Sequence, residues 1–291
     1  MNELSIIKYI SKLKSAQVGG NIFFQKSCAD NKTRGSYGIG DDCADNKTKG
    51  SYGIGDDCAD NKTRGSYGIG DDCADNKTRG SYGIGDDCAV IPFSKQESIL
   101  VTTDSLIENV HFNLEWISLY ELGCKSVLVN ISDILSCGGV PEYLFLSINV
   151  PKRLNKLEKL FNGIDFVCRK YGIKILGGDT TSSKNDLCIT VTLMGKVKNE
   201  NILYRHFSRP GELICVTGFV GLSGTGFYVL KDKLNKNQYK ESVRHHLVPG
   251  ILSLKDAKIL SENAGSSMDN SDGLYSSLWY MLEKNNNVCI I

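Results

Sequence analysis

The sequence predicts an α/β (α+β) fold in two parts: a mixed-sheet N-terminal domain over 1–198 and a smaller C-terminal α/β domain over 199–291. Three observations predict it. Apolar segments of strand length alternate with segments whose apolar residues recur at helical spacing. A chain of 291 residues with 41% hydrophobic content can bury a core large enough for two domains. Around 199–210 the chain turns polar, which we take as the boundary between them.

The elements of the first domain follow from its periodicity. Apolar residues at helical spacing predict a short opening helix over 3–14 and a long helix over 118–137, which we expect Gly138-Gly139 and Pro141 to end. A further helix is predicted over 154–171. Short apolar runs predict the strands, at 88–92, 98–104, 109–112, 143–150, 173–176 and 187–198.

The second domain is predicted to hold two strands and three helices. The strands are expected at 213–217 and 266–269, and the helices at 222–231, 253–263 and 273–284. The closing VCII resembles the start of another strand, so we expect this domain to be small and incomplete.

A fifteen-residue unit, CADNKTRGSYGIGDD, occurs four times in tandem from Cys28, and its only variation is Lys49 in place of Arg. Each unit has only Tyr and Ile as bulky apolar residues, too few to form a core. We therefore interpret 28–72 as a surplus flexible loop. The last copy differs because its Asp87 leads directly into the apolar CAVIP segment, which can anchor it in a sheet.

Composition excludes several function classes. The net charge of +1 shows no basic bias, so a nucleic-acid partner is not expected. No run approaches 18 apolar residues and the N-terminus has no signal-peptide core, so we expect a cytoplasmic protein without membrane contact. Five of the eleven cysteines are one repeated position and none forms a CxxC pair, which favours free thiols in a reducing compartment.

Acidic residues recur where predicted strands end or helices begin. They stand in GIGDD, VTTDS, NISDI, LGGDTTS and SMDNSDG. Hard cations such as Mg²⁺ prefer oxygen ligands, and glycines beside an acid let the backbone approach phosphate. No Walker loop, GxSxG motif or Cys–His signature is present, so a covalent nucleophile is not expected. The pattern predicts a magnesium and phosphate site.

In this order the segments resemble the thiamine-monophosphate kinase family, within the ATP-binding superfamily that includes aminoimidazole ribonucleotide synthetase and selenophosphate synthetase. The pairing of VNISD with GGDTT is its most characteristic feature. The resemblance implies Mg²⁺-dependent transfer of the γ-phosphoryl group of ATP to thiamine monophosphate, giving thiamine diphosphate. It also implies homodimers that pair through the sheets of their N-terminal domains, with several Mg²⁺ ions.

The resemblance also implies roles for individual residues. The Mg²⁺ ligands would be Asp87, Thr102, Thr103, Asp104, Asp133, Asp179, Asp269 and Asp272. ATP would contact Gly178, Asp179, Arg205 and Ser271, and thiamine monophosphate would contact His111. On the residues alone, an exposed linker arginine explains Arg205 equally well. A lone strand histidine such as His111 is most often structural.

Two alternatives remain open. One is a related ATP-dependent synthetase of the same superfamily, and GGDTT with the VHF segment favours the kinase over it. The other is a non-catalytic divalent-metal-binding repeat protein, in which all four GIGDD units would bind ions equally. The family pattern continues past VCII with an acidic GGEDYEL segment that this sequence lacks, so we expect a truncated C-terminal domain.

Overall fold

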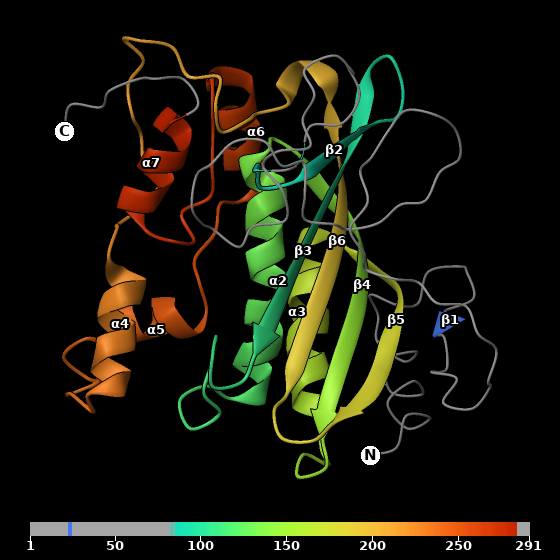
Figure 1. Ribbon diagram of the computed structural model, residues 1–291, viewed down its shortest axis with the longest axis vertical. Coiled ribbons are helices and arrows are strands. Elements are labelled where there is room, and N and C mark those ends of the chain that lie inside the picture. The colour runs from blue at the N-terminus through green and yellow to red at the C-terminus, as the bar shows by residue number, and fades with distance from the viewer. Residues whose placement is uncertain (1–22, 25–82, 84, 284–291) are drawn as a thin grey trace, which may run out of the picture.

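The computed structural model describes residues 23–24, 83 and 85–283 (Figure 1). Three predictions fall outside the described residues: the helix at 3–14, the surplus repeat loop at 28–72 and the closing VCII strand. Among the helices of the described ranges, none is long and apolar enough to cross a membrane.

A mixed sheet forms the centre of the N-terminal part, as predicted. Its strand order is β1-β5-β4-β6-β3-β2. The strands are β1 (Phe23–Phe24), β2 (Ala89–Pro92), β3 (Glu97–Ile107), β4 (Val140–Pro151), β5 (Lys174–Ser183) and β6 (Cys188–Lys198). β5 runs parallel to β4 and β1, whereas the β2–β3, β3–β6 and β4–β6 pairs are antiparallel.

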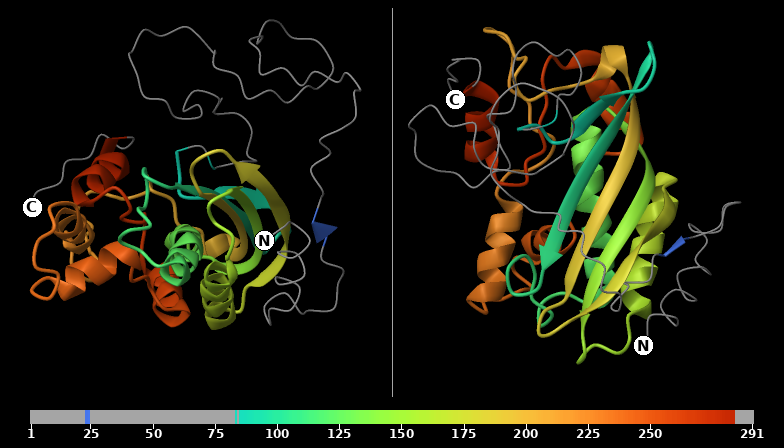
Figure 2. Two further views of the ribbon diagram at one scale, coloured as in Figure 1. Left: turned by 90° about the horizontal axis from the view of Figure 1, so that it is seen from below. Right: turned by 45° about the vertical axis from the view of Figure 1, so that its right-hand side comes forward.

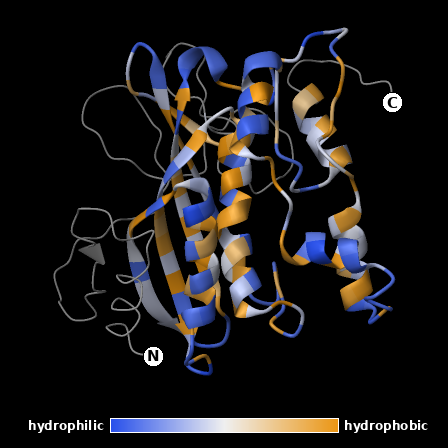
Figure 3. Cartoon of the chain, turned by 180° about the vertical axis from the view of Figure 1, so that it is seen from behind, coloured by the Kyte–Doolittle hydropathy of each residue, from blue (hydrophilic) through white to orange (hydrophobic). Residues whose placement is uncertain are grey.

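Two helices, α2 (Leu119–Ser136) and α3 (Glu158–Tyr171), cover one face of this sheet (Figure 2). They approach closely at a pair of glycines: a Cβ on Gly123 would lie 2.1 Å from the Leu160 carbonyl oxygen, and one on Gly163 would lie 2.0 Å from that of Tyr120. Hydrophobic residues predominate along α2, in contrast to the hydrophilic α5 (Lys240–Leu247) (Figure 3). The main core therefore lies between these two helices and the sheet.

Local signals set both ends of α2. Ser118 and Glu121 form a reciprocal capping box at its start. After the helix, Gly138 takes a positive φ of 81° and the chain enters β4 at Val140. Pro141 was predicted to stop the helix, but it is part of β4.

The C-terminal part is helical over the residues that the structure describes. After a 3₁₀ turn, η2 (Asn199–Asn201), come α4 (Leu222–Lys231), α5, α6 (Leu254–Asn263) and α7 (Leu274–Glu283). The three predicted helices are present, and α5 was not predicted. The strands predicted at 213–217 and 266–269 are wrong, because those residues have no strand conformation.

Two further strand predictions in the N-terminal part need correction. In the segment 109–112, residues 109–111 form a turn and Phe112 makes only an isolated bridge with Glu108, so the predicted strand is wrong. Asn109 in this turn has a φ of 63°. The strand predicted at 173–176 continues through GGDTTSS to Ser183, because β4 pairs with it along this whole length.

Candidate functional site

The candidate site lies where three segments outside the sheet meet β3 and the C-terminal half of α2. The segments are 85–87 before β2, 203–206 after β6 and 266–269 before α7. They are far apart in the chain, and one hydrogen bond between them joins residues 182 positions apart. The site is therefore a product of tertiary packing.

On β3, Thr102 and Asp104 face α2. The Thr102 hydroxyl donates a 2.6 Å hydrogen bond to Asp133 Oδ2 on the helix. Since side chains alternate along a strand, Asp104 shares this face with Thr102, whereas Thr103 projects from the opposite face. There the Thr103 hydroxyl lies 3.0 Å from that of Thr192. The structure thus brings Thr102, Asp104 and Asp133 together and places the Thr103 side chain elsewhere.

Asp87, the second acid of the last GIGDD, is the most connected residue of the site. Its Oδ1 accepts a 2.8 Å hydrogen bond from Nε of Arg205 and a second one from Nη2 of the same guanidinium. Its Oδ2 accepts from the Ser136 hydroxyl and, at 2.9 Å, from the Asp269 backbone N–H. The Asp87 side chain is 1% exposed. Asp87 therefore ties α2 to both C-terminal segments.

Arg205 is held on its backbone as well as on its side chain. Its backbone N–H donates to Asp86 Oδ1 at 3.0 Å, and its guanidinium lies 5.8 Å from the ring centre of Tyr280. Burial lowers the pKa of Arg205, but the nearby carboxylates, led by Asp87, raise that pKa overall. The interpretation of Arg205 as an exposed linker arginine is therefore wrong, while its contact with ATP stays a prediction.

The carboxyl groups of the site raise one another's pKa, because the negative charge of each disfavours ionisation of the others. Burial, followed by the charge of Asp104, raises the pKa of Asp133 to about 9, against the opposing hydrogen bond from Thr102. Burial, followed by the charge of Asp87, raises the pKa of Asp269 to about 7, with Arg205 opposing. Burial also raises the pKa of Asp104. The positive charge near these carboxyl groups does not offset these rises in pKa, and a divalent cation would supply more.

The arrangement is an open one. In the described part of the chain, no three His, Cys, Asp or Glu side chains stand close enough to enclose a metal ion. Mg²⁺ commonly takes one or two carboxylates and completes its shell with water and substrate phosphate. The acids around Asp133 therefore fit a Mg²⁺–phosphate site rather than a closed protein cage.

Gly178 and Asp179 lie away from these acids. Asp104 pairs with Val191 of β6, which pairs with Leu146 of β4, which pairs with Gly178 of β5. Three strand spacings separate Asp104 from Gly178, which is about 14 Å. A Cβ at Gly178 would lie 1.7 Å from the Leu146 carbonyl oxygen, so glycine is required there. Asp179 accepts a 2.9 Å hydrogen bond from the Thr180 backbone N–H.

The remaining predicted residues surround the cluster. His111 is exposed, and its Nδ1 accepts a 3.0 Å hydrogen bond from the Ile107 backbone N–H. It is close enough to Asp104 to oppose the rise in the pKa of that acid, whose main cause is burial. Ser271 donates a weak 3.4 Å hydrogen bond to Asp269, and Asp272 is exposed.

Sequence reasoning missed Ser136 and Asp86. Ser136 is buried one helical turn after Asp133, where it was read only as part of a helix. The i, i+3 spacing would have placed it on the same side of α2 as Asp133. Asp86, the first acid of the same pair as Asp87, accepts from the Arg205 backbone and lies 3.7 Å from Nδ1 of His206.

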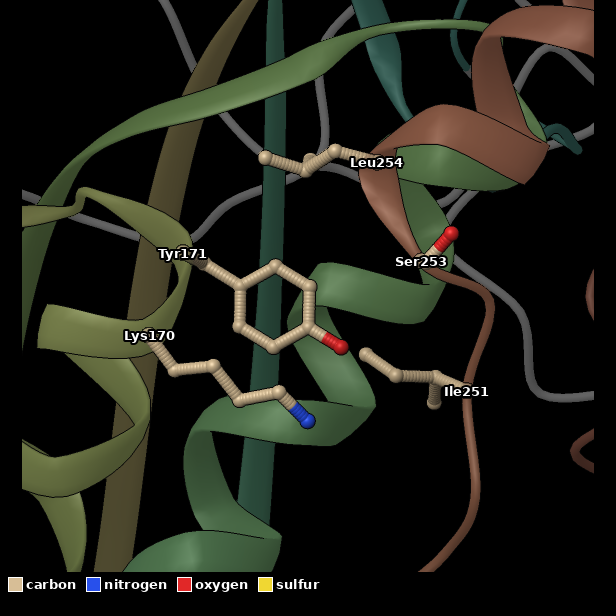
Figure 4. Close-up of a pocket in the computed structure, with 5 residues that line it drawn as sticks. All are labelled: Lys170, Tyr171, Ile251, Ser253 and Leu254. Carbon is tan, nitrogen blue, oxygen red and sulfur yellow. The ribbon is translucent and has the colours of Figure 1, made fainter.

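A separate cavity of about 270 Å³ lies at the end of α3 (Figure 4). It is lined by Lys170, Tyr171, Ile251, Ser253 and Leu254. The Tyr171 hydroxyl donates a 3.4 Å hydrogen bond to the Leu252 carbonyl oxygen at its edge. None of the predicted site residues lines this cavity, so it is distinct from the acidic site.

The part of the chain that holds the sheet, its acidic strand and the acidic helix is similar to a known family of proteins. Residues 85–197 match the model of the family AIR synthase related protein, N-terminal domain. Within that family, the similarity of the chain is to thiamine-monophosphate kinases. It is 36% identical over 198 residues to the enzyme of that name from Buchnera aphidicola (subsp. Acyrthosiphon pisum), covering 67% of this chain and 60% of the relative. With the Bacillus subtilis enzyme the identity is 32% over 138 residues, or 47% and 42% of the two chains.

Solved structures give the same result. AaThiL complexed with AMPPCP and TMP matches with a TM-score of 0.65 and 29% identity, covering 70% of this chain and 65% of the other. Thiamine-monophosphate kinase from Stenotrophomonas maltophilia K279a matches with a TM-score of 0.60 and 28% identity, covering 72% and 68%. The chain spans about 60% of the length of most of the curated relatives that it matches.

Proposed function

We propose that this chain is a thiamine-monophosphate kinase, which transfers the γ-phosphoryl group of ATP to thiamine monophosphate and gives thiamine diphosphate. The observation that carries the proposal is the convergence of Asp87, Asp104, Asp133, Asp269 and Arg205 from separate segments onto one site. The similarity to several thiamine-monophosphate kinases supports it.

We assign Mg²⁺ to the acidic cluster. Asp87, Thr102, Asp104, Asp133 and Asp269 are proposed ligands because their side chains converge on one site, where water and substrate phosphate would complete the metal shell. Thr103, Asp179 and Asp272 remain proposed ligands from the family resemblance. When bound, Mg²⁺ would neutralise phosphate charge and align donor with acceptor. The hydrogen bond from Thr102 holds the Asp133 carboxylate in a fixed direction. Arg205 would pair with a phosphate of ATP through its forked N–H groups, which suit phosphate as well as carboxylate.

Gly178, Asp179 and Ser271 remain proposed nucleotide contacts and His111 a proposed contact of the thiamine substrate. Exposure of His111 and of Ser271 is compatible with contact to a ligand.

We also propose a homodimer that pairs through the face of the sheet opposite α2 and α3. Large apolar side chains lie exposed on or beside that face, namely Ile91, Phe93, Phe145 and Leu176. Burying such side chains between two copies would stabilise the pair. Sedimentation equilibrium tests it: a monomer at micromolar concentration would contradict the proposal.

Two further assignments belong to the same proposal. The division into domains at 198/199 is supported by the change at the end of β6 from sheet to helices. A cytoplasmic location suits an enzyme that consumes ATP and carries free thiols at its described cysteines.

The direct test is conversion of thiamine monophosphate by the purified 291-residue chain with ATP and Mg²⁺, followed by chromatography of the product. We expect thiamine diphosphate and ADP in equal amounts, and no product in EDTA or with the Asp133→Asn variant. ATP consumption with a carboxylic or ribonucleotide acceptor instead would favour a related synthetase. Binding of about four ions with no ATP consumption would favour the repeat-protein reading.

A further inference from the structure

The acceptor capacity of Asp87 is fully used by the protein. A carboxylate has about four lone-pair sites. Arg205 fills those of Oδ1 through Nε and Nη2, and Ser136 and the Asp269 backbone fill those of Oδ2. Asp87 is nevertheless one of the acids that the family resemblance assigns to Mg²⁺. A metal ion could bind Oδ1 only if the guanidinium moved away.

We propose that Arg205 is an internal counter-cation that competes with Mg²⁺ for Asp87, and that nucleotide phosphate releases Asp87 by taking over the guanidinium. The inference rests on the proposed function, since it requires a Mg²⁺–nucleotide site. Its consequence is that Mg²⁺ and nucleotide bind cooperatively, and that Arg205 carries this coupling.

Arg205 would make the same kind of contact before and after it moves from Asp87 to a nucleotide phosphate. A guanidinium forms the same paired N–H···O contacts with a phosphate as with a carboxylate, so Arg205 would replace one anion by another. Mg²⁺ and a guanidinium repel each other and cannot share one carboxylate oxygen. Mg²⁺ bound to Asp87 thus favours the binding of phosphate to Arg205. Phosphate bound to Arg205 favours Mg²⁺ equally, because such coupling is reciprocal.

The surroundings of Arg205 allow its side chain to move while its backbone stays fixed. The backbone is anchored at both groups: its N–H donates to Asp86, and its carbonyl oxygen accepts a 2.8 Å hydrogen bond from the Ser266 hydroxyl. The side chain is 19% exposed and packs on Tyr280, whose ring is partly open to solvent. A swing of the guanidinium therefore requires no rearrangement of the 203–206 segment.

Calorimetric titration of MgCl₂ into the nucleotide-free protein tests the competition. Arg205→Met should bind Mg²⁺ about tenfold more tightly than the wild type, within the usual range of coupling between two ligands. Arg209→Met, which removes the same charge from an exposed position four residues away, should change the affinity by less than about twofold because that charge is screened. Unchanged or weaker Mg²⁺ binding by a folded Arg205→Met protein would overturn the proposal.

A second measurement uses the wild type and so does not depend on how the variant folds. The ¹⁵Nε–H signal of Arg205, assigned by its loss in Arg205→Lys, should move toward that of a free guanidinium as MgCl₂ is added. If Mg²⁺ saturates the protein and this signal stays in place, Arg205 does not leave Asp87 and the inference fails. Neither experiment contains thiamine monophosphate, so absence of kinase activity would refute the proposed function and leave this competition intact.

Discussion

Thr102 and Asp133 are 31 residues apart in sequence, yet the Thr102 hydroxyl donates a 2.6 Å hydrogen bond to Asp133 Oδ2. This contact fixes the acid of α2 against the inner face of β3. Asp104 is on the same face of that strand, so two carboxylates share a partly buried space between a strand and a helix. The pKa of Asp133 is raised to about 9 as a result.

The first prediction concerns Asp133→Asn. Below pH 9 the metal-free folded protein keeps Asp133 protonated, whereas the unfolded chain ionises it above about pH 4. The folded state then binds more protons, so this group lowers stability as pH rises from about 4 to about 9. Asparagine does not ionise, so the Asp133→Asn variant does not lose this stability as the pH rises. In EDTA at pH 8 we expect the variant to melt at least about 2 °C above the wild type, and at pH 4 close to it.

Activity provides the second half of that test. Mg²⁺ should raise the melting temperature of the wild type and not that of Asp133→Asn, and kinase activity of the variant should fall by orders of magnitude. A variant that melts lower than the wild type in EDTA at pH 8 would contradict the electrostatic account of this residue.

The second prediction concerns Ser136, which donates to Asp87 from the last turn of α2. Ser136→Ala removes a hydrogen bond to the buried carboxylate of Asp87. Such a bond to a charged group contributes about 1.5–3 kcal/mol to stability when no other donor replaces it. We expect the Mg²⁺ concentration for half-maximal activity to rise several-fold, with kcat at saturating Mg²⁺ little changed. Ser136→Thr should restore the wild-type value.

Ser126→Ala is the matched control for Ser136. Ser126 is buried in the same helix, but its hydroxyl donates to the Gly123 carbonyl oxygen of that helix at 2.9 Å. Its removal should leave the Mg²⁺ requirement unchanged. An equal effect of both substitutions would mean that Ser136 acts through the stability of α2 rather than through Asp87.

The third prediction concerns the repeat. Deleting Cys28 to Asp72 leaves one GIGDD joined to β2, and extra loop length costs only about 0.6 kcal/mol per doubling. The shortened protein should keep the activity and the Mg²⁺ stoichiometry of the full chain. Asp87→Asn should impair activity strongly, and Asp72→Asn, the equivalent acid one copy earlier, should not. Equivalent effects of these two substitutions would favour the hypothesis of a metal-binding repeat protein.

The fourth prediction concerns acid stability. Burial, followed by the charge of Lys125, lowers the pKa of His246 to about 4, although a hydrogen bond involving Ser223 opposes the shift. The unfolded chain therefore binds a proton at this residue between about pH 6.5 and pH 4 when the folded chain does not. Stability should fall over that range on acidification. His246→Gln should reduce this fall in thermal melts, and parallel curves for the two proteins would contradict it.

The sequence by itself determined the local structure and the order of the acids. Periodicity identified α2 and gave the bounds 222–231 of α4 without error, because a helix forms its hydrogen bonds within one segment. The link from Asp87 into an apolar strand also follows from the chain alone, and the structure bears out that strand as β2.

Tertiary structure decided what depends on a partner. A strand needs a neighbour for its hydrogen bonds, so β5 extends through two glycines beside β4 while 213–217 forms no strand in the described residues. The alternation of β3 separates Thr103 from Thr102, and the fold alone seats Arg205 on Asp87, 118 residues away. Such contacts cannot be predicted from the spacing of residues along the chain. A salt bridge or a strand pairing stabilises the fold only when two separate segments come together, and the tertiary structure decides which segments do.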